Sequence, residues 1–347
     1  MTIKKLFSEK IIHWYHRHKR SLPWRYTNDP YYIWVSEILL QQTRVNQGVP
    51  YYYRFIEKFP NIYALASAPL QEVLRVWQGL GYYSRARNMH ATAIDIVQNH
   101  KGVFPKSYHE LLKLKGVGKY SAAAIASFAY KEKVPALDGN AIRVLCRVHN
   151  VYDDVKKTKT QNTLFSIGSR YIADVDASDF NQAIIEFGAI QCKAHKPLCG
   201  ECILSTLCEA YRDNNVENVP YASSKIKAKA RDIKYAVLTY NETIMMKKRT
   251  EKDIWIGLYD FVEIDQLAKL TELDNIMMYI NTHKPLIYKH ILTHQKLTVY
   301  FWQIEVKNAE KKILKENGFS FYHLEDIVNL PKSVIIDRYI NHIFKPQ

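Results

Sequence analysis

Residues 114–140 read LKGVGKYSAAAIASFAYKEKVPALDGN. The stretch opens with a Gly-Val-Gly turn at residues 116–118, which lies between two segments of helical character. Such a turn leaves backbone N–H groups pointing outward at the start of the next helix, where the helix dipole also attracts anions such as phosphate. The alanine-rich helix that follows allows close packing against a neighbour. Taken alone, the turn is equally typical of an ordinary helical hairpin.

The charge of the chain is concentrated around this hairpin. The 347 residues carry a net charge of +15, and the first 150 residues contain 22 Lys+Arg against 9 Asp+Glu. A basic surface with interleaved tyrosines suits a polyanionic partner such as nucleic acid, although a charged face is often only solvated.

The length and the apolar pattern indicate a globular protein of two or three domains. No apolar run approaches the length of a membrane span, and the N-terminal residues MTIKKLFSEK lack the apolar core of a signal peptide. We therefore expect a cytoplasmic protein without membrane contact, whose cysteines are metal ligands more often than disulfides.

A helix that begins at Asp29-Pro30 carries the first candidate for acid–base chemistry. Asp29 is a capping residue and Pro30 suits the first helical position. The helix is apolar over most of its surface, yet Glu37 lies in its middle on the same side as Trp34 and Ile38. Burial raises a carboxyl pKa and lets the acid donate a proton near neutral pH. The alternative is a buried glutamate paired with an arginine.

Four cysteines form a compact candidate metal site. Cys192, Cys199, Cys202 and Cys208 have the spacing C-x6-C-x2-C-x5-C. Four thiolates so close in sequence can hold zinc or an iron–sulfur cluster. Zinc ribbons usually contain two C-x2-C pairs, and this segment contains one.

The residue pattern changes period once along the chain. Residues 1–212 show helical patterns without strand-like alternation, including helices at 3–18, 69–78 and 84–99 and a capping box at Ser107 and Glu110. Residues 213–231 are polar and irregular, which predicts an interdomain linker. The remaining residues, 232–347, predict an α+β domain with strands at 232–240, 243–248, 255–261 and 297–306 and helices near 265–281 and 331–344.

Several motifs together resemble one protein family along essentially the whole chain. They are LPWR (22–25), SEILLQQT (36–43), GLGYYSRARN (79–88), LKGVGKY (114–120), LDGN (137–140) and FNQAIIEFGA (180–189). With the cysteine spacing, they resemble the MutY family of adenine DNA glycosylases. The resemblance implies a helix-hairpin-helix at 114–120, a [4Fe–4S] loop at 192–208 and a Nudix-like domain at 232–347. IGLYDF (256–261) resembles a Nudix strand, but the glutamate-rich helix of Nudix hydrolases is missing, so pyrophosphate hydrolysis is not expected.

The resemblance also implies the reaction and the residues that perform it. Double-stranded DNA with adenine opposite 8-oxoguanine or guanine would be the partner, and a monomer would hydrolyse the N-glycosidic bond. Glu37 would be the general acid and base, Asp138 would stabilise the sugar cation, and Tyr120 and Asn140 would position sugar and water. Substrate and DNA would be contacted by Trp24, Arg25, Gln41, Gln42, Thr43, Tyr82, Gly116, Val117, Gly118, Gln182, Leu292, Thr293 and His294. The cluster would be bound by Cys192, Cys199, Cys202 and Cys208.

Two positions depart from related patterns. In the lyases of the superfamily a lysine stands two residues beyond the second hairpin glycine, whereas this chain has Tyr120, which favours hydrolysis by water over a Schiff base. Residues 290–294, HILTH, resemble the family's H-x-F-S-H loop, with Leu292 in place of the aromatic residue. The alternatives are an endonuclease III-like pyrimidine glycosylase and lyase, a non-catalytic DNA-binding protein and a zinc-based structural module. A bacterial protein of this kind would be associated with the nucleoid.

Overall fold

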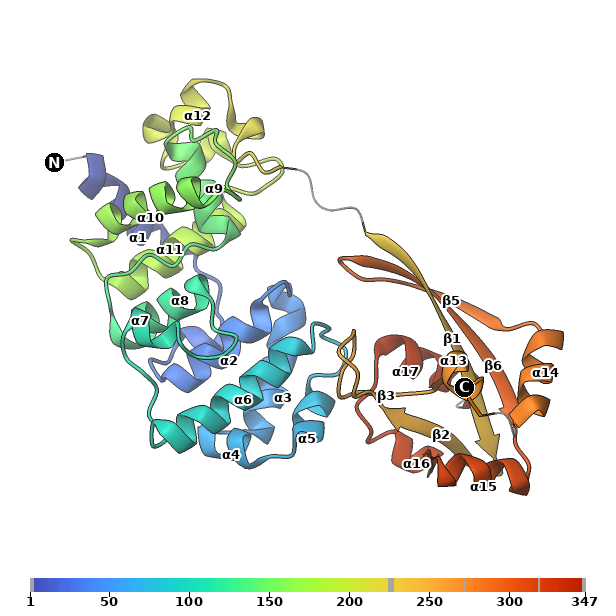
Figure 1. Ribbon diagram of the computed structural model, residues 1–347. Coiled ribbons are helices and arrows are strands. Elements are labelled where there is room, and N and C mark those ends of the chain that lie inside the picture. The colour runs from blue at the N-terminus through green and yellow to red at the C-terminus, as the bar shows by residue number, and fades with distance from the viewer. Residues whose placement is uncertain (1–2, 224–227, 271–272, 318, 345–347) are drawn as a thin grey trace. The chain divides into compact units, whose positions relative to one another are not determined.

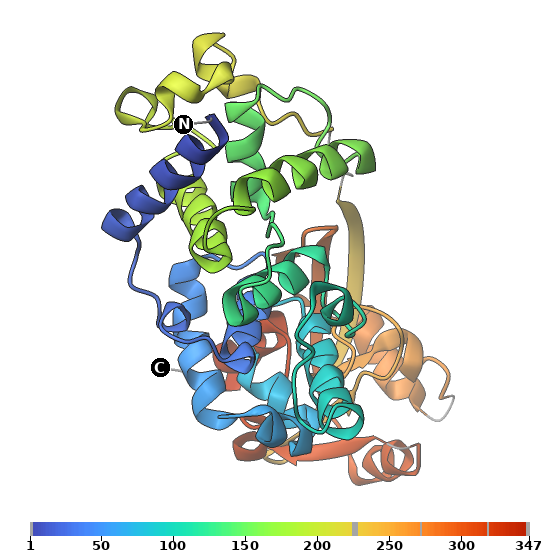
Figure 2. The same cartoon turned by 90° about the vertical axis from the view of Figure 1, so that its left-hand side faces the viewer.

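The computed structural model describes residues 3–223, 228–270, 273–317 and 319–344. The chain divides into two compact units (Figures 1 and 2). The first comprises Met1–Ser67 and Asn88–Ser224, and the second comprises Ala68–Arg87 and Lys225–Gln347. The predicted boundaries at 212, 213–231 and 232 remain predictions, and part of that linker, 224–227, lies outside the described residues. In this grouping Ala68–Arg87 belongs with the C-terminal half of the chain.

The first unit is helical, as the sequence predicts. Every regular element among the described residues before Lys229 is a helix. The α-helices are α1 (Ile3–His18), α2 (Pro30–Leu40), α3 (Val45–Lys58), α4 (Ile62–Ser67), α6 (Ser84–Asn99, shared with the second unit), α7 (Tyr108–Leu111), α8 (Lys119–Tyr130), α9 (Gly139–Val148), α10 (Thr158–Ile172), α11 (Ala177–Ile190) and α12 (Glu209–Arg212). Short 3₁₀ turns are η1 (Pro23–Arg25), η2 (Cys199–Glu201), η3 (Ser205–Leu207) and η4 (Val216–Asn218).

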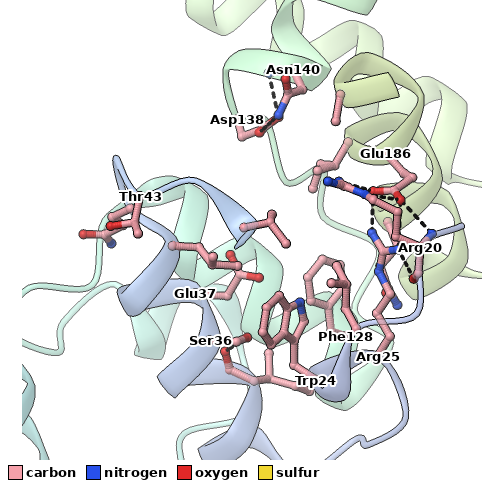
Figure 3. Close-up of a pocket in the computed structure, with 18 of the residues that line it drawn as sticks. Arg20, Trp24, Arg25, Ser36, Glu37, Thr43, Phe128, Asp138, Asn140 and Glu186 are labelled. Carbon is pink, nitrogen blue, oxygen red and sulfur yellow. Dashed lines mark hydrogen bonds and ion pairs between the residues drawn. The ribbon is translucent and has the colours of Figure 1, made fainter. Parts of the chain in front are cut away.

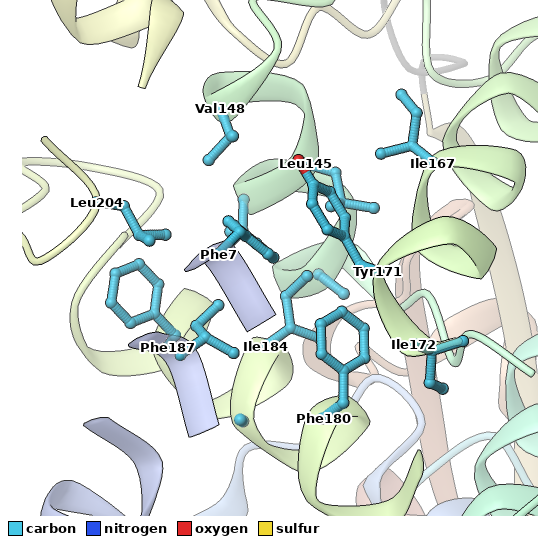
Figure 4. Packing of buried hydrophobic residues seen from close by; sticks show 14 of the residues in the cluster. Phe7, Leu145, Val148, Ile167, Tyr171, Ile172, Phe180, Ile184, Phe187 and Leu204 are labelled. Carbon is cyan, nitrogen blue, oxygen red and sulfur yellow. The ribbon is translucent and has the colours of Figure 1, made fainter. Parts of the chain in front are cut away.

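One hydrophobic cluster of this unit is built from α1, α9, α10 and α11 (Figure 4). Phe7 and Tyr171 pack with ring centroids 4.2 Å apart, and Phe180 and Phe187 are buried beside them. Leu204, from the cysteine-bearing segment, belongs to the same cluster. The cysteine segment is therefore anchored to the helices that also bear the site described below.

Helix α2 carries its polar residues into the interior. The Asp29 carboxylate caps the helix by accepting from the Tyr31 N–H at 2.8 Å, as predicted. Eight of its eleven residues are buried, Glu37 among them. The helix packs against α3 and α8, and most of its central turn is buried between them.

The hairpin between α7 and α8 has the predicted form. The Ser107–Glu110 capping box starts α7. Gly116 has φ +79°, and a Cβ there would lie 2.7 Å from Cβ of Asn88, so both conformation and space require glycine. Gly118 is the N-cap of α8, and a Cβ there would meet nothing within 4 Å, while the Val117 N–H donates to the Leu114 carbonyl at 3.2 Å.

The second unit is a seven-stranded mixed sheet covered by helices. Its path runs β3-β2-β1-β6-β5, with β4 paired to β1 and β7 to β2, and only the β1–β6 pair is parallel among the named pairings. The strands are β1 (Lys229–Tyr240), β2 (Thr243–Lys248), β3 (Tyr259–Asp260), β4 (Val262–Glu263), β5 (Leu286–Ile291), β6 (Gln295–Glu305) and β7 (Ser320–His323). The helices are α5 (Leu70–Val76), α13 (Ile264–Leu267), α14 (Asp274–Thr282), α15 (Asn308–Glu316), α16 (Leu324–Ile327) and α17 (Val334–Phe344).

Alternation along β1 assigns its residues to two different cores. Ile233, Tyr235 and Val237 pack with α17, whereas Ala236 and Leu238 pack with α14 and α15 on the opposite face. The predicted combination of a helical region and an α+β domain is therefore confirmed.

Several element predictions in this unit were wrong in detail. Of the strand predicted at 255–261, only Tyr259–Asp260 forms, because Trp255 (φ 63°) and Gly257 (φ 84°) have left-handed backbone that ends an extended strand. The helix predicted near 265–281 is two helices, α13 and α14, and residues 271–272 between them lie outside the described residues. None of the helices described is long and apolar enough to cross a membrane.

Candidate active site

A cavity of about 550 Å³ opens in the first unit between η1, α2, α8, α9 and α11 (Figure 3). Ten of the predicted site residues line it, although they come from distant parts of the sequence. They are Trp24, Arg25, Glu37, Gln41, Gln42, Thr43, Tyr120, Asp138, Asn140 and Gln182. The two predicted catalytic carboxyl groups thus share one cavity.

Glu37 lies in an environment that favours its protonated form. The residue is 7% exposed. Burial raises the pKa of Glu37 to about 7, and the nearby Asp138 charge adds to this, while a hydrogen bond with Tyr120 and the Arg25 charge oppose it. A carboxylic acid with this pKa can donate a proton at neutral pH and accept one again.

Asp138 lies at the N-terminus of a helix, where an ionised carboxylate is stabilised. It is the N-cap of α9 and accepts from the N–H groups of Asn140 and Ala141 at 2.9 and 2.7 Å. The Asn140 side chain donates a third bond at 2.6 Å. Burial raises the pKa of Asp138 above its ordinary value, and these three donors work against that rise. Hydrogen bonds and the helix dipole therefore support a buried negative charge at this carboxylate.

Asn140 is held by its own neighbours. Its side-chain oxygen accepts from Nη2 of Arg143 at 2.9 Å, and the same nitrogen donates to the Gly188 carbonyl at 2.6 Å. A Cβ on Gly188 would lie 2.6 Å from the Asn140 carbonyl oxygen, so only glycine allows α11 to approach the start of α9 this closely.

Glu186 is a site residue that the sequence interpretation missed. It is fully buried, lines the cavity and accepts five hydrogen bonds from Arg20 and Arg25. Burial alone would raise the pKa of Glu186, yet the bonds from both arginines lower it to about 2. The buried glutamate paired with arginine, considered above for Glu37, is thus Glu186. Its position four residues after Gln182 in α11 was the available signal.

The other end of the cavity is lined by aromatic rings and amides. Trp24 packs edge-on against Tyr52, with ring centroids 5.2 Å apart. Gln182 accepts from the Tyr15 hydroxyl at 2.9 Å and donates to Ser178 Oγ at 3.1 Å, which fixes the orientation of its amide. This end of the cavity therefore places the Trp24 ring near the Gln182 amide, whose orientation is fixed, and the Arg25 guanidinium.

The remaining predicted residues lie outside this cavity. Gly116, Val117 and Gly118 form the hairpin turn, and the Val117 side chain is buried, which leaves only its backbone for a ligand. Gln42, within the cavity, and Tyr82, outside it, are non-glycine residues with left-handed backbone, φ 57° and 49°. Strained conformations of this kind concentrate at functional positions.

Tyr82 and the 290–294 loop both belong to the second unit. The Tyr82 hydroxyl forms a short hydrogen bond with the Thr293 hydroxyl. Residues 292–294 make the turn between β5 and β6, where Thr293 and His294 are exposed. Leu292 instead packs against the α17 face of the sheet, and Ile291 beside it is 75% exposed.

The four predicted metal-binding cysteines converge. Cys192, Cys199, Cys202 and Cys208 line one small cavity, and Nη1 of Arg147 lies 3.4 Å from the Cys192 sulfur. Within the described residues, no three His, Cys, Asp or Glu side chains are arranged to hold a metal ion. Four cysteine thiols around one cavity are a donor set that both zinc and iron–sulfur clusters use.

Comparison with known proteins identifies the family. Residues 35–169 match the HhH-GPD superfamily of base excision DNA repair proteins, and residues 234–342 match the NUDIX domain. The adenine DNA glycosylase of Buchnera aphidicola subsp. Baizongia pistaciae is 34% identical over 325 residues, which cover 92% of this chain and 91% of that protein. The chain belongs to the adenine DNA glycosylase family. The predicted resemblance is therefore confirmed.

Other members of this family and solved structures agree with that assignment. The mouse adenine DNA glycosylase is 40% identical over 215 residues, covering 59% of this chain and 42% of the mouse protein. The structure of a thermostable thymine-DNA glycosylase matches with a TM-score of 0.56 and 28% identity, covering 60% of this chain and 97% of that one. An endonuclease III–DNA complex, 24% identical with a TM-score of 0.51, shares the fold. This adenine DNA glycosylase family member is thus a base excision repair enzyme that acts on DNA.

Proposed function

We propose that the protein removes adenine paired with 8-oxoguanine or guanine by hydrolysing its N-glycosidic bond. The main support is that Glu37 and Asp138 line one cavity and differ in their hydrogen-bond donors: burial raises the pKa of both, but Asp138 accepts three N–H bonds at the N-terminus of α9, whereas Glu37 has a hydrogen bond with Tyr120. An extruded adenosine would enter the cavity, because its glycosidic bond is out of reach inside a duplex.

Glu37 would supply the proton that adenine needs in order to leave. The protonated carboxyl group donates its proton to N7 of adenine, the C1′–N9 bond breaks with both electrons going to the base, and neutral adenine departs. The ionised Glu37 then accepts a proton from the water that attacks C1′, which restores the acid.

Asp138 would stabilise the sugar cation formed when the bond breaks. Its carboxylate is held by three N–H donors, so it stays fixed while positive charge develops on the sugar. Tyr120 and Asn140, which contact Glu37 and Asp138 respectively, would position the sugar and the water.

The lining of the cavity favours water over a lysine nucleophile. No lysine is among the residues that line it, and Lys119, beside Tyr120, lines a different cavity. A Schiff base needs an amine at C1′, so we expect a monofunctional enzyme. Treatment with borohydride during turnover should trap no covalent DNA complex, and a trapped complex would favour the pyrimidine glycosylase and lyase alternative.

Two further assignments belong to this proposal. A [4Fe–4S] cluster would be bound by Cys192, Cys199, Cys202 and Cys208, and about four irons per monomer are expected on metal analysis. The base opposite adenine would be read by the turn that contains Thr293 and His294, together with Tyr82, while Leu292 would contribute little because it packs inward.

The decisive experiment measures base release from three duplexes under single-turnover conditions. Adenine opposite 8-oxoguanine and opposite guanine should be released, and adenine opposite thymine should remain. Glu37→Gln should bind the mispaired duplex and release no adenine. Release of adenine by that variant would remove Glu37 from its role, and equal release from all three duplexes would contradict the mispair specificity.

A further inference from the structure

The exposed face of α10 has an unusual composition. The helix sequence TKTQNTLFSIGSRYI contains no Asp or Glu. Its buried side includes Leu164, Ile167 and Tyr171. Its exposed side aligns Lys159, Asn162, Thr163, Ser166 and Arg170 at helical spacing over a shallow surface hollow. Lys159, Asn162, Ser166 and Arg170 carry side-chain donors, while the Thr163 hydroxyl donates to the Lys159 carbonyl at 3.1 Å.

This face is continuous with the phosphate-binding hairpin. A neighbouring cavity of about 380 Å³ is lined by Lys119 and Tyr108 from the hairpin and by Asn162 and Phe165 from α10. Asn162 lines both hollows, so they meet along α10. Lys119 is the first residue of α8, directly after the N-cap Gly118. A ligand bound at the hairpin N–H groups could therefore extend along α10 without a gap.

The charge of this surface is of one sign. Lys119, Lys159 and Arg170 are its cations, and no carboxylate lines either hollow. Within the described parts of the chain these three cations form no ion pair. Helix α15 shows the more usual pattern, in which Lys312 lies 4.0 Å from Glu316. An ordinary solvated helix face mixes both signs, whereas the α10 face does not.

We infer that the exposed face of α10 is a second contact surface for the DNA backbone, which follows the phosphates beyond the hairpin. From Lys159 to Arg170 the helix extends about 16 Å, long enough to follow several phosphates. Cations interspersed with hydroxyl and amide donors are the groups that bind phosphate oxygens and fix a protein's register on a duplex. The surface adds affinity without base specificity. The inference rests on DNA being the substrate and is independent of the roles proposed for Glu37 and Asp138.

The test removes the two cations of α10 and measures the salt dependence of binding. In the double variant Lys159→Gln/Arg170→Gln, the affinity for an undamaged 30-base-pair duplex should fall about tenfold at 0.1 M salt. The slope of log K against log salt should decrease by about 1.8, because each lost phosphate contact contributes about 0.9. Ser166→Lys should change both quantities in the opposite direction. Adenine release from saturated, mispaired duplex should keep its wild-type rate.

A matched control separates a local contact from net charge. Lys312→Gln/Lys315→Gln removes the same charge from exposed positions of α15 and should leave the slope unchanged. A second control uses two mispaired duplexes, each shortened on a different side of the mispair. Wild type and the α10 variant should bind one of them equally, because its shortened flank no longer reaches α10, and should still differ in affinity for the other. An unchanged slope, an equal loss in the α15 control, or a loss that ignores flank length would each overturn the inference. If the wild-type protein released no adenine, the proposed function would be contradicted, but the binding test of the α10 surface would still be valid.

Discussion

Two buried glutamates in one cavity have opposite electrostatic surroundings. Glu186 accepts hydrogen bonds from Arg20 and Arg25, which lower its pKa to about 2, so it is ionised throughout the physiological pH range. Among the described residues no arginine or lysine forms an ion pair with Glu37, and burial raises its pKa to about 7. Environment alone therefore separates a structural carboxylate from a group able to exchange protons at neutral pH.

The pH dependence of adenine release should follow Glu37. The general acid must be protonated, so the single-turnover rate should be constant below about pH 7 and fall about tenfold per pH unit above it. The measurement is a pH series of single-turnover rates on saturated mispaired duplex. A rate that stays constant up to pH 9 would contradict this assignment.

The same residue should limit stability at high pH. The pKa of Glu37 is about 7 in the folded chain and near its ordinary value when unfolded, so the folded state binds its proton more tightly. The protonated Glu37 therefore contributes on the order of 3 kcal/mol to the free energy of unfolding. This contribution is fully present below about pH 4.5 and is lost as pH rises toward 7. Glu37→Gln should raise the melting temperature at pH 8 more than at pH 5. Equal shifts at the two pH values would contradict the raised pKa.

Glu186 should be required for the shape of the cavity. Glu186→Gln leaves the Arg25 guanidinium, only 8% exposed, without its counter-charge, which should cost about 3–5 kcal/mol of unfolding free energy. Chemical denaturation measures that loss, and Glu57→Gln on the exposed face of α3 is the charge-matched control. Glu186→Asp should recover part of the stability and of adenine release. A Glu186→Gln variant as stable as the control would contradict the ion-pair argument.

At the scale of elements, one glycine sets the distance between two helices of the site. Gly188→Ala would push α11 away from the start of α9, where Asn140 contacts Asp138. Overpacking of this kind should cost about 1–3 kcal/mol and slow adenine release. Gly139→Ala, whose new Cβ would meet nothing within 4 Å, should leave the unfolding free energy equal or slightly higher. Equal stabilities of the two variants would contradict the close-approach argument.

Local signals predicted the helical elements well and the second unit less well. Asp29-Pro30 and the Ser107–Glu110 box are self-contained capping signals, and both helices begin there. The segment at 255–261 has strand-like residues, but its backbone is left-handed at Gly257 and also at Trp255, a residue type that rarely adopts this conformation. Helix-forming preferences act within a few residues, whereas short strands such as β3 and β4 exist only through pairing with distant partners.

The candidate site shows the same division. Motif-bearing residues such as Glu37, Asp138 and Tyr120 could be predicted, because the family pattern marks them. Glu186 lies within a quoted motif, yet its role depends on Arg20 and Arg25, which are more than 160 residues away in sequence. Ion pairs between residues so far apart in sequence form only through tertiary packing, so no local or periodic sequence pattern predicts them.

At the scale of the whole molecule, an N-terminal segment is held by the C-terminal half of the chain. Arg87 donates to the Ile256 carbonyl at 2.8 Å, the Tyr83 hydroxyl donates to the Lys332 carbonyl at 3.3 Å, and Gln78 accepts from the Lys332 N–H at 3.2 Å. Residues 68–87 therefore depend on residues that follow them by more than 160 positions.

Ending the chain at residue 223 should expose this segment. Without Ile256 and Lys332, residues 68–87 lose their partners, and limited proteolysis or hydrogen exchange should find them unprotected. As a control, a full-length chain cut after Ser223 with both pieces present should keep the protection. A shortened chain that protects residues 68–87 as well as the intact protein would show that these contacts contribute nothing.

The contribution of residues 68–87 to the second unit also affects how the protein is made. A nascent chain leaves the ribosome from its N-terminus, so the end of this segment emerges 169 residues before Ile256, the first of the residues that hold it. At typical elongation rates that interval lasts roughly 8–34 s. During it the apolar side chains of α5, Val73 and Leu74 among them, lack the later residues of the second unit and stay more exposed to water than in the finished fold.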